Sequence, residues 1–136
     1  MADGWIGAGS SSTEEFRRGV EVLRESLEAG ARDLSTFAVA KRVYVAVDRD
    51  RRRARSRLRR WFSLFYGDPE LADRVTVFGP PDACVEGLAA VAEAGAGMIV
   101  LNPVFDEQEQ AELLAAEVGP GLSPKPVRPA RRASSG

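Results

Sequence analysis

The sequence predicts an α/β fold of about three strand–helix units with parallel strands, and two observations support this prediction. Short apolar segments rich in β-branched residues alternate with segments whose apolar residues recur every three or four positions. Strands that alternate with helices in this way pair in parallel through helical crossovers. No linker divides residues 1–122, so we expect them to form one domain.

The first unit begins with residues 3–7, which predict a short strand that runs into a Gly/Ser-rich loop, residues 7–12. Ser12 and Glu15 have the spacing of a capping box, which predicts that a helix starts there. We expect Gly30 to end this helix as a left-handed residue. Its apolar stripe comprises Phe16, Val20, Leu23 and Leu27.

The second unit begins with residues 37–47, which are largely apolar on both faces, as in a strand that is covered on both sides. Lys41 and Arg42 interrupt this strand, and we expect one to face the inner side of the sheet and the other the helices or an edge. Because an unpaired buried charge is costly, an ion pair is favoured over a ligand contact. Asp48 is the expected cap of the next helix, which residues 67–69 should end. Its apolar stripe comprises Ala54, Leu58, Trp61, Phe62 and Phe65.

In the third unit, residues 75–78 predict a short extended piece before a helix with proline in its first turn. Residues 98–101 are wholly apolar and predict the last strand, which Asn102 follows. Asp106 and Glu109 have the spacing of another capping box. The residues expected to be buried by these two helices are Cys84, Leu88, Val91, Ala92, Leu113, Leu114 and Val118, with Gly119-Pro120 ending the fold.

Composition argues against several classes of function. The apolar runs are far shorter than the roughly 20 residues of a spanning helix. Cys84 is the only cysteine and histidine is absent, which excludes an internal disulfide, argues against metal chemistry and predicts a reducing cytoplasmic location. Residues 123–136 carry a charge of +4 and three prolines, so we expect a disordered basic tail. Residues 49–60 hold eight arginines and one acid, for which a solvated helix face is favoured over nucleic-acid binding.

Three segments, in order, resemble the C-terminal part of the luciferase-like oxidoreductases, which use FMN or the deazaflavin coenzyme F420. Residues 2–6 (Ala-Asp-Gly-Trp-Ile) resemble strand six of that family, and residues 40–46 (Ala-Lys-Arg-Val-Tyr-Val-Ala) resemble strand seven. Residues 79–103 begin with Gly-Pro-Pro-Asp, contain Ala-Gly-Ala and end in Asn-Pro, like the following helix, turn and strand eight. The resemblance covers residues 2–122.

This resemblance implies a partial (β/α)8 TIM-barrel fold, because three strands cannot close a barrel that typically takes about 250 residues. The family's catalytic and ring-binding residues come largely from the first strands, which have no counterpart in this chain. The implied function is therefore one wall of the substrate and cofactor pocket of an oxidoreductase or monooxygenase. The resemblance implies FMN or F420 as the cofactor and no turnover by this chain alone.

Candidate cofactor- or substrate-binding residues are Gly7, Gly9, Ser10 and Ser11, whose loop joins a strand to a helix N-terminus, where N–H groups can hold an anion. An ordinary loop with a serine cap is the alternative. Asn102 follows the last strand at the expected mouth of the barrel, or it simply starts the turn before Pro103. We assign no catalytic residue and no metal ligand.

We expect a chain that supplies the missing strands, or another copy of this chain, as the partner, together with an unspecified small-molecule substrate. A second hypothesis is a non-catalytic interaction module that pairs through an open edge of its sheet. Nucleic-acid binding through residues 49–60 is a third and weaker one, and nothing predicts a membrane partner.

Overall fold

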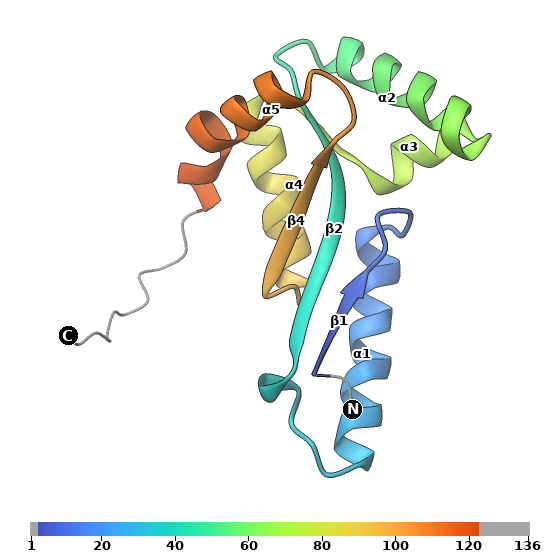
Figure 1. Ribbon diagram of the computed structural model, residues 1–136, viewed down its shortest axis with the longest axis vertical. Helices are drawn as coiled ribbons and strands as arrows, with labels where there is room; N and C mark the ends of the chain where they lie inside the picture. Colours follow the sequence, from blue (N-terminus) through green and yellow to red (C-terminus); the bar gives the residue numbers. More distant parts are fainter. Residues whose placement is uncertain (1–2, 123–136) are drawn as a thin grey trace, which may run out of the picture.

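The computed structural model describes residues 3–122, which form a parallel four-stranded sheet with helices packed around it (Figure 1). The strands are β1 (Gly4–Gly7), β2 (Ala38–Val47), β3 (Val77–Gly79) and β4 (Met98–Pro103). The helices are α1 (Thr13–Ala29), α2 (Arg51–Tyr66), α3 (Pro69–Val75), α4 (Pro81–Glu93) and α5 (Glu107–Leu113), with short helical turns at Leu34–Thr36, Leu114–Val118 and Gly119–Leu122. The predicted α/β class with parallel strands is confirmed.

Strand β2 organises the sheet because each of the other three strands pairs with it. Its first residues, Ala38–Lys41, pair with β1, and its last, Val45–Val47, pair with β3. Strand β4 pairs with Ala40–Val45. Since Lys41 pairs with both β1 and β4, these two strands lie on opposite edges of β2, and β3 lies on the same edge as β1. Within residues 3–122, the outer edges of β1 and β4 pair with no further strand.

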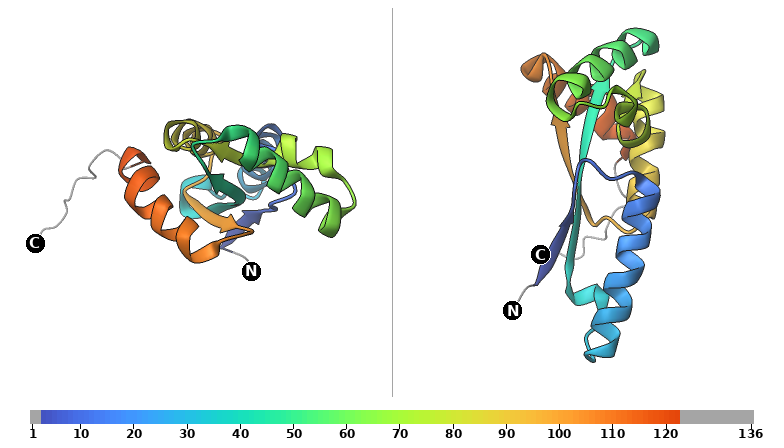
Figure 2. Two further views of the ribbon diagram at one scale, coloured as in Figure 1. Left: turned by 90° about the horizontal axis from the view of Figure 1, so that it is seen from above. Right: turned by 90° about the vertical axis from the view of Figure 1, so that its right-hand side faces the viewer.

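The two faces of the sheet differ in how they are covered. Helices α1 and α4 lie along one face (Figure 2, right), where the odd-numbered residues of β2 form the core. We call the opposite side the inner face. By alternation and register it carries Ile6, Ala38, Ala40, Arg42, Tyr44, Ala46, Met98, Val100 and Asn102. Ile6 is 53% exposed and Met98 63% exposed, so the part of this face distant from α2 is open to solvent.

Helix α2 covers the remaining part of the inner face. It crosses the sheet near the carboxyl ends of the strands (Figure 2, left), and its buried residues Ala54, Leu58 and Phe62 pack with Tyr44 and Ala46. The predicted apolar stripe of this helix is confirmed except at Phe65, which is 67% exposed. The C-terminal part of α2 thus places three aromatic rings, those of Trp61, Phe62 and Tyr66, against Tyr44 of β2.

The predicted cap of α2 is wrong, and the segment after this helix holds an element that the sequence analysis did not predict. The helix starts after Asp50, whose carboxylate accepts the Arg53 N–H at 3.1 Å, whereas Asp48 instead binds the Arg53 guanidinium at 2.7 Å. Residues 67–69 end α2 as predicted, with Gly67 as its left-handed cap, but Pro69 also begins the unpredicted helix α3. Proline fits the first turn of a helix, and the Asp68 carboxylate caps the new one.

The ends of other elements also shift. The predicted capping box of α1 is confirmed, with Ser12 N–H donating to Glu15 Oε1 at 2.8 Å. The left-handed residue after α1 is Ala31 (φ 62°) and not Gly30 (φ −92°). Asp106 precedes α5 but makes no side-chain cap, so the second capping box is wrong. The predicted extended piece, residues 75–78, is displaced to Val77–Gly79, because residue 75 still belongs to α3.

Three predictions concern absences or the tail. The predicted disordered tail, residues 123–136, lies outside the described residues. Among residues 3–122 we find no cluster of histidine, cysteine or acidic side chains able to hold a metal ion. No helix in this range is long and apolar enough to cross a membrane.

Candidate functional site

The predicted site residues gather where the parallel strands end. Gly7 is the last residue of β1. Asn102, predicted to follow the last strand, instead lies inside β4, one residue before its end, because the strand extends to Pro103. Asn102 is paired in register with Tyr44, and a Cβ added to Gly9 would lie only 2.7 Å from Tyr44 Cε2. The structure thus brings Gly9 and Asn102 to the same tyrosine on the inner face.

Close packing explains the glycines of the β1–α1 loop, residues 7–12. A Cβ on Gly7 would lie 2.6 Å from Phe16 Cδ1, so any larger residue would push the loop away from α1. The Ser11 hydroxyl donates to the Ala8 carbonyl at 2.8 Å and is used within the loop. Ser10 is exposed, and its hydroxyl makes no hydrogen bond with the described residues.

Lys41 and Arg42 point to opposite sides of β2, as predicted, but the ion pair expected for one of them is absent. Among residues 3–122, neither side chain contacts a carboxylate. Lys41 is 1% exposed on the helix side, and burial lowers its pKa to about 8, an effect that the charge of Glu15 opposes. Arg42 is exposed on the inner face, where its Cδ would lie 3.2 Å from a Cβ on Gly9.

A pair of tyrosines that was not predicted completes the candidate site. The hydroxyl groups of Tyr44 and Tyr66 lie 2.8 Å apart and share a hydrogen bond. Burial, reinforced by this hydrogen bond, raises the pKa of Tyr44 to about 12, against the lowering effect of Arg42. Tyr44 therefore stays neutral at physiological pH. Its hydroxyl can donate or accept hydrogen bonds, but it cannot act as a general base.

The structure also contains a buried side-chain amide that was not predicted, that of Gln110. Gln110 on α5 is 5% exposed, and its side chain accepts the Val47 N–H at 2.8 Å and donates to the Val47 carbonyl at 2.9 Å. These two bonds satisfy the backbone at the end of β2 and fix α5 there. Gln110 is accordingly structural.

Cys84 shows the properties of a buried small apolar residue, as predicted. It is fully buried, its Sγ lies 3.5 Å from the Gly79 carbonyl, and desolvation raises its pKa to about 11. The thiol stays protonated at neutral pH and is not a nucleophile.

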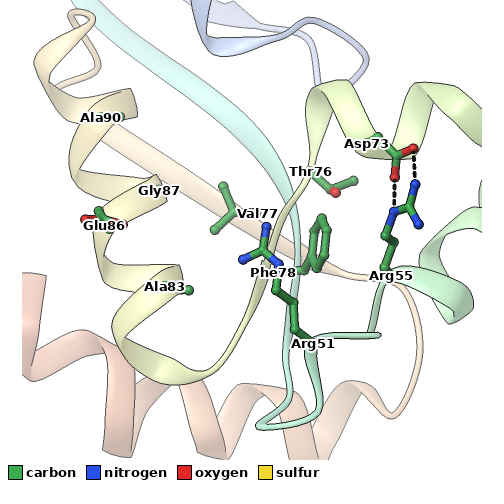
Figure 3. Close-up of a pocket in the computed structure, with 10 residues that line it drawn as sticks. All are labelled: Arg51, Arg55, Asp73, Thr76, Val77, Phe78, Ala83, Glu86, Gly87 and Ala90. Atoms are coloured by element: carbon green, nitrogen blue, oxygen red, sulfur yellow. Dashed lines mark hydrogen bonds and ion pairs between the residues drawn. The ribbon is translucent and has the colours of Figure 1, made fainter. Parts of the chain in front are cut away.

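A hollow of about 690 Å³ lies beside β3 between α2, α3 and α4 (Figure 3), and none of the candidate residues lines it. Arg51 stacks over the Phe78 ring at 4.7 Å, and Arg55 pairs with Asp73 at 2.9 Å. The two arginines that line this hollow therefore already have partners among its other lining residues. Because it contains none of the strand ends that form the candidate site, we assign it no role.

The arginine-rich segment is tied into the fold by ion pairs. Five of its eight arginines contact carboxylates: Arg49 with Glu117, Arg53 with Asp48, Arg55 and Arg59 with Asp73, and Arg57 with Asp106. These pairs are consistent with the interpretation that the arginines lie on the solvated side of α2.

Comparisons with solved structures place this fold. The chain superposes on an F420-dependent secondary alcohol dehydrogenase with a TM-score of 0.70 and 14% identity, over 90% of this chain and 43% of that one. It superposes on the coenzyme F420-dependent tetrahydromethanopterin reductase of Methanopyrus kandleri with a TM-score of 0.71 and 17% identity, over 90% and 46%. The chain has the fold of part of these enzymes.

A third match is the FMN-bound oxygenating constituent of 3,6-diketocamphane monooxygenase from Pseudomonas putida, a type II Baeyer–Villiger enzyme. Its TM-score is 0.56 at 20% identity, over 88% of this chain and 48% of that one. No protein-family description and no curated protein sequence matches the chain. The chain spans less than half the length of the solved chains it matches, which confirms the predicted partial-barrel fold.

Proposed function

We propose that this chain forms one wall of the pocket of an F420- or FMN-dependent oxidoreductase, and that a further polypeptide supplies the remaining strands. The observation that carries this proposal is the inner face, open to solvent around Ile6 and Met98 and flanked by two unpaired strand edges, in a fold that matches under half of each enzyme. In a closed barrel, such a face lines the interior and its carboxyl end forms the site.

The residues at the carboxyl end of the inner face suit part of such a pocket. The Ser10 hydroxyl and the Arg42 guanidinium are without acceptors among the described residues and suit an anionic group of a cofactor or substrate. The Tyr44–Tyr66 hydroxyls and the Asn102 amide suit a polar, uncharged group. Gly7, Gly9 and Ser11 shape the loop around them.

The cofactor would supply the redox chemistry, since the described part of this wall offers hydrogen-bond groups and one guanidinium but no histidine or reactive thiol. We therefore assign binding roles, and no catalytic role, to this wall. Without the other walls, a cofactor would stay largely in water, so we propose that the chain alone has no activity.

Photo-crosslinking from the inner face tests the missing-strand proposal. We expect Ile6→p-benzoylphenylalanine, expressed in the source cells, to crosslink to a polypeptide segment whose sequence shows alternating strands and helices. The reason is that Ile6 lies beside the unpaired edge of β1 and is 53% exposed. Mass spectrometry of the crosslinked peptides identifies that segment.

The matched control is the same substitution at Val22, which is 62% exposed on α1. Equal yields and targets from the two positions would contradict the proposal. A crosslink from Ile6 to another copy of this chain would instead support the second candidate function, a module that self-associates through its open edges, which the unpaired β1 and β4 edges favour.

A further inference from the structure

Lys41 uses all three of its ammonium donors on backbone carbonyls around the β1–α1 loop. Its Nζ donates to the carbonyl of Ala8 at 2.7 Å, to that of Ser11 at 3.1 Å and to that of Arg42 at 2.9 Å. Two of these acceptors belong to the loop and the third to β2. The lysine thus ties two points of the loop to the strand beside it.

Few other groups near Lys41 compensate for the burial of its charge. Residues 4–12 and 98–103, in β1, the loop and β4, contain no ionisable side chain, and Arg42 points away on the inner face. Glu15 on α1 is the acidic group whose charge acts on it, but that carboxylate accepts the Ser12 N–H. The Phe16 ring, with its centroid 5.9 Å from Nζ, adds a cation–π contact at the outer limit of its range.

This arrangement is costly for stability. A buried charge loses its hydration, and here the compensation is hydrogen bonds to three neutral carbonyls and not a carboxylate partner. The lowered pKa shows the same cost, because the folded protein holds this proton less tightly than the unfolded chain. Stability of the fold is therefore a poor explanation for the ammonium.

We propose that Lys41 is a positioning residue that fixes the β1–α1 loop by turning the Ala8 and Ser11 carbonyls inward. This inference rests on the proposed function, which assigns ligand contacts to that loop. With its carbonyls directed at the buried ammonium, the loop keeps Gly9 against Tyr44 and leaves the Ser10 hydroxyl free for a ligand.

Carbonyl ¹³C chemical shifts of the full chain, followed from pH 6 to pH 10, test the inference without any cofactor. In the unmodified protein we expect the Ala8 and Ser11 carbonyls to titrate together with a midpoint near pH 8, because deprotonation removes one donor. In Lys41→Met both shifts should become independent of pH. Hydrogen exchange of residues 8–12 should accelerate by about tenfold or more, while α4 stays protected.

Val43→Ala is the matched control, since Val43 is buried on the same strand and the same face but contacts no loop carbonyl. It should lower global stability without a selective effect on the loop. Carbonyl shifts that do not titrate, or equal loop exchange in the two variants, would overturn the inference. The two proposals can also fail separately. If the Ala8 and Ser11 carbonyls titrate as expected but the assembled protein binds no cofactor, only the proposed function is contradicted.

Discussion

Phe62→Ala is expected to destabilise the protein by about 3–5 kcal/mol, the usual cost of removing a fully buried aromatic ring. Phe62 is 0% exposed and packs edge-on against Tyr44 at 5.3 Å and stacked on Tyr66 at 5.1 Å between ring centroids. Its loss would therefore leave a cavity between α2 and the inner face. Urea unfolding monitored by circular dichroism measures the effect.

Phe65→Ala provides the control on the same helix, because Phe65 is 67% exposed. Its effect should stay within about 0.5 kcal/mol. Similar losses in the two variants would show that α2 does not pack on the sheet as described, and that Tyr66 is not held beside Tyr44.

Gly95→Ala is expected to cost about 2–4 kcal/mol, from two causes that act together. Gly95 has φ of 127°, which an L-residue rarely adopts, and an added Cβ would lie 2.9 Å from Val20 Cγ1. Val20 belongs to the buried side of α1 and has little room to move within the core. Because Gly95 makes the turn from α4 into β4, the variant should also loosen the edge strand that carries Asn102. Thermal or urea unfolding measures the loss.

Gly30→Ala is the matched substitution at the end of α1. Gly30 has φ of −92°, and its nearest neighbour would be 3.7 Å from an added Cβ. We expect no loss there and a gain of up to about 1 kcal/mol, through a less flexible unfolded chain. A loss at Gly30 as large as at Gly95 would contradict the backbone geometry on which both predictions rest.

Local patterns were sufficient for most of the fold. The apolar stripes of α1, α2 and α4 and the β-branched run of β2 bury large areas, so periodicity located them. Boundaries were less predictable, because several acidic residues compete to cap a helix, as Asp48 and Asp50 do. Pro69 likewise fits both the end of one helix and the start of another.

The candidate site was predictable only in part. Parallel strands end on one side of a sheet, which is why the glycine loop and Asn102 could be predicted to lie near each other. The partners of Lys41 could not be predicted, since backbone carbonyls carry no signal in the residue pattern. Tyr66 lies 22 residues after Tyr44, and only the fold of α2 over the sheet joins them. Only Tyr44 could have been found from the sequence, because it places a hydroxyl group within an otherwise largely apolar strand.

The assignment of residues 1–122 to one barrel-derived domain, and a cytoplasmic location, stay predictions. The central claim is that this chain provides one wall of a pocket whose other walls come from elsewhere. It predicts a sharp difference in cofactor binding between the chain alone and the assembled protein, because binding requires the ligand to be enclosed.

Titration of FMN and of F420, followed by their fluorescence, tests this claim most directly. With the isolated 136-residue chain we predict no saturable binding. With the polypeptide identified by crosslinking from Ile6 added, we predict saturable binding of one of the two cofactors at one per complex. Stoichiometric binding by the monomeric chain alone, or no binding by the assembled complex, would contradict the account.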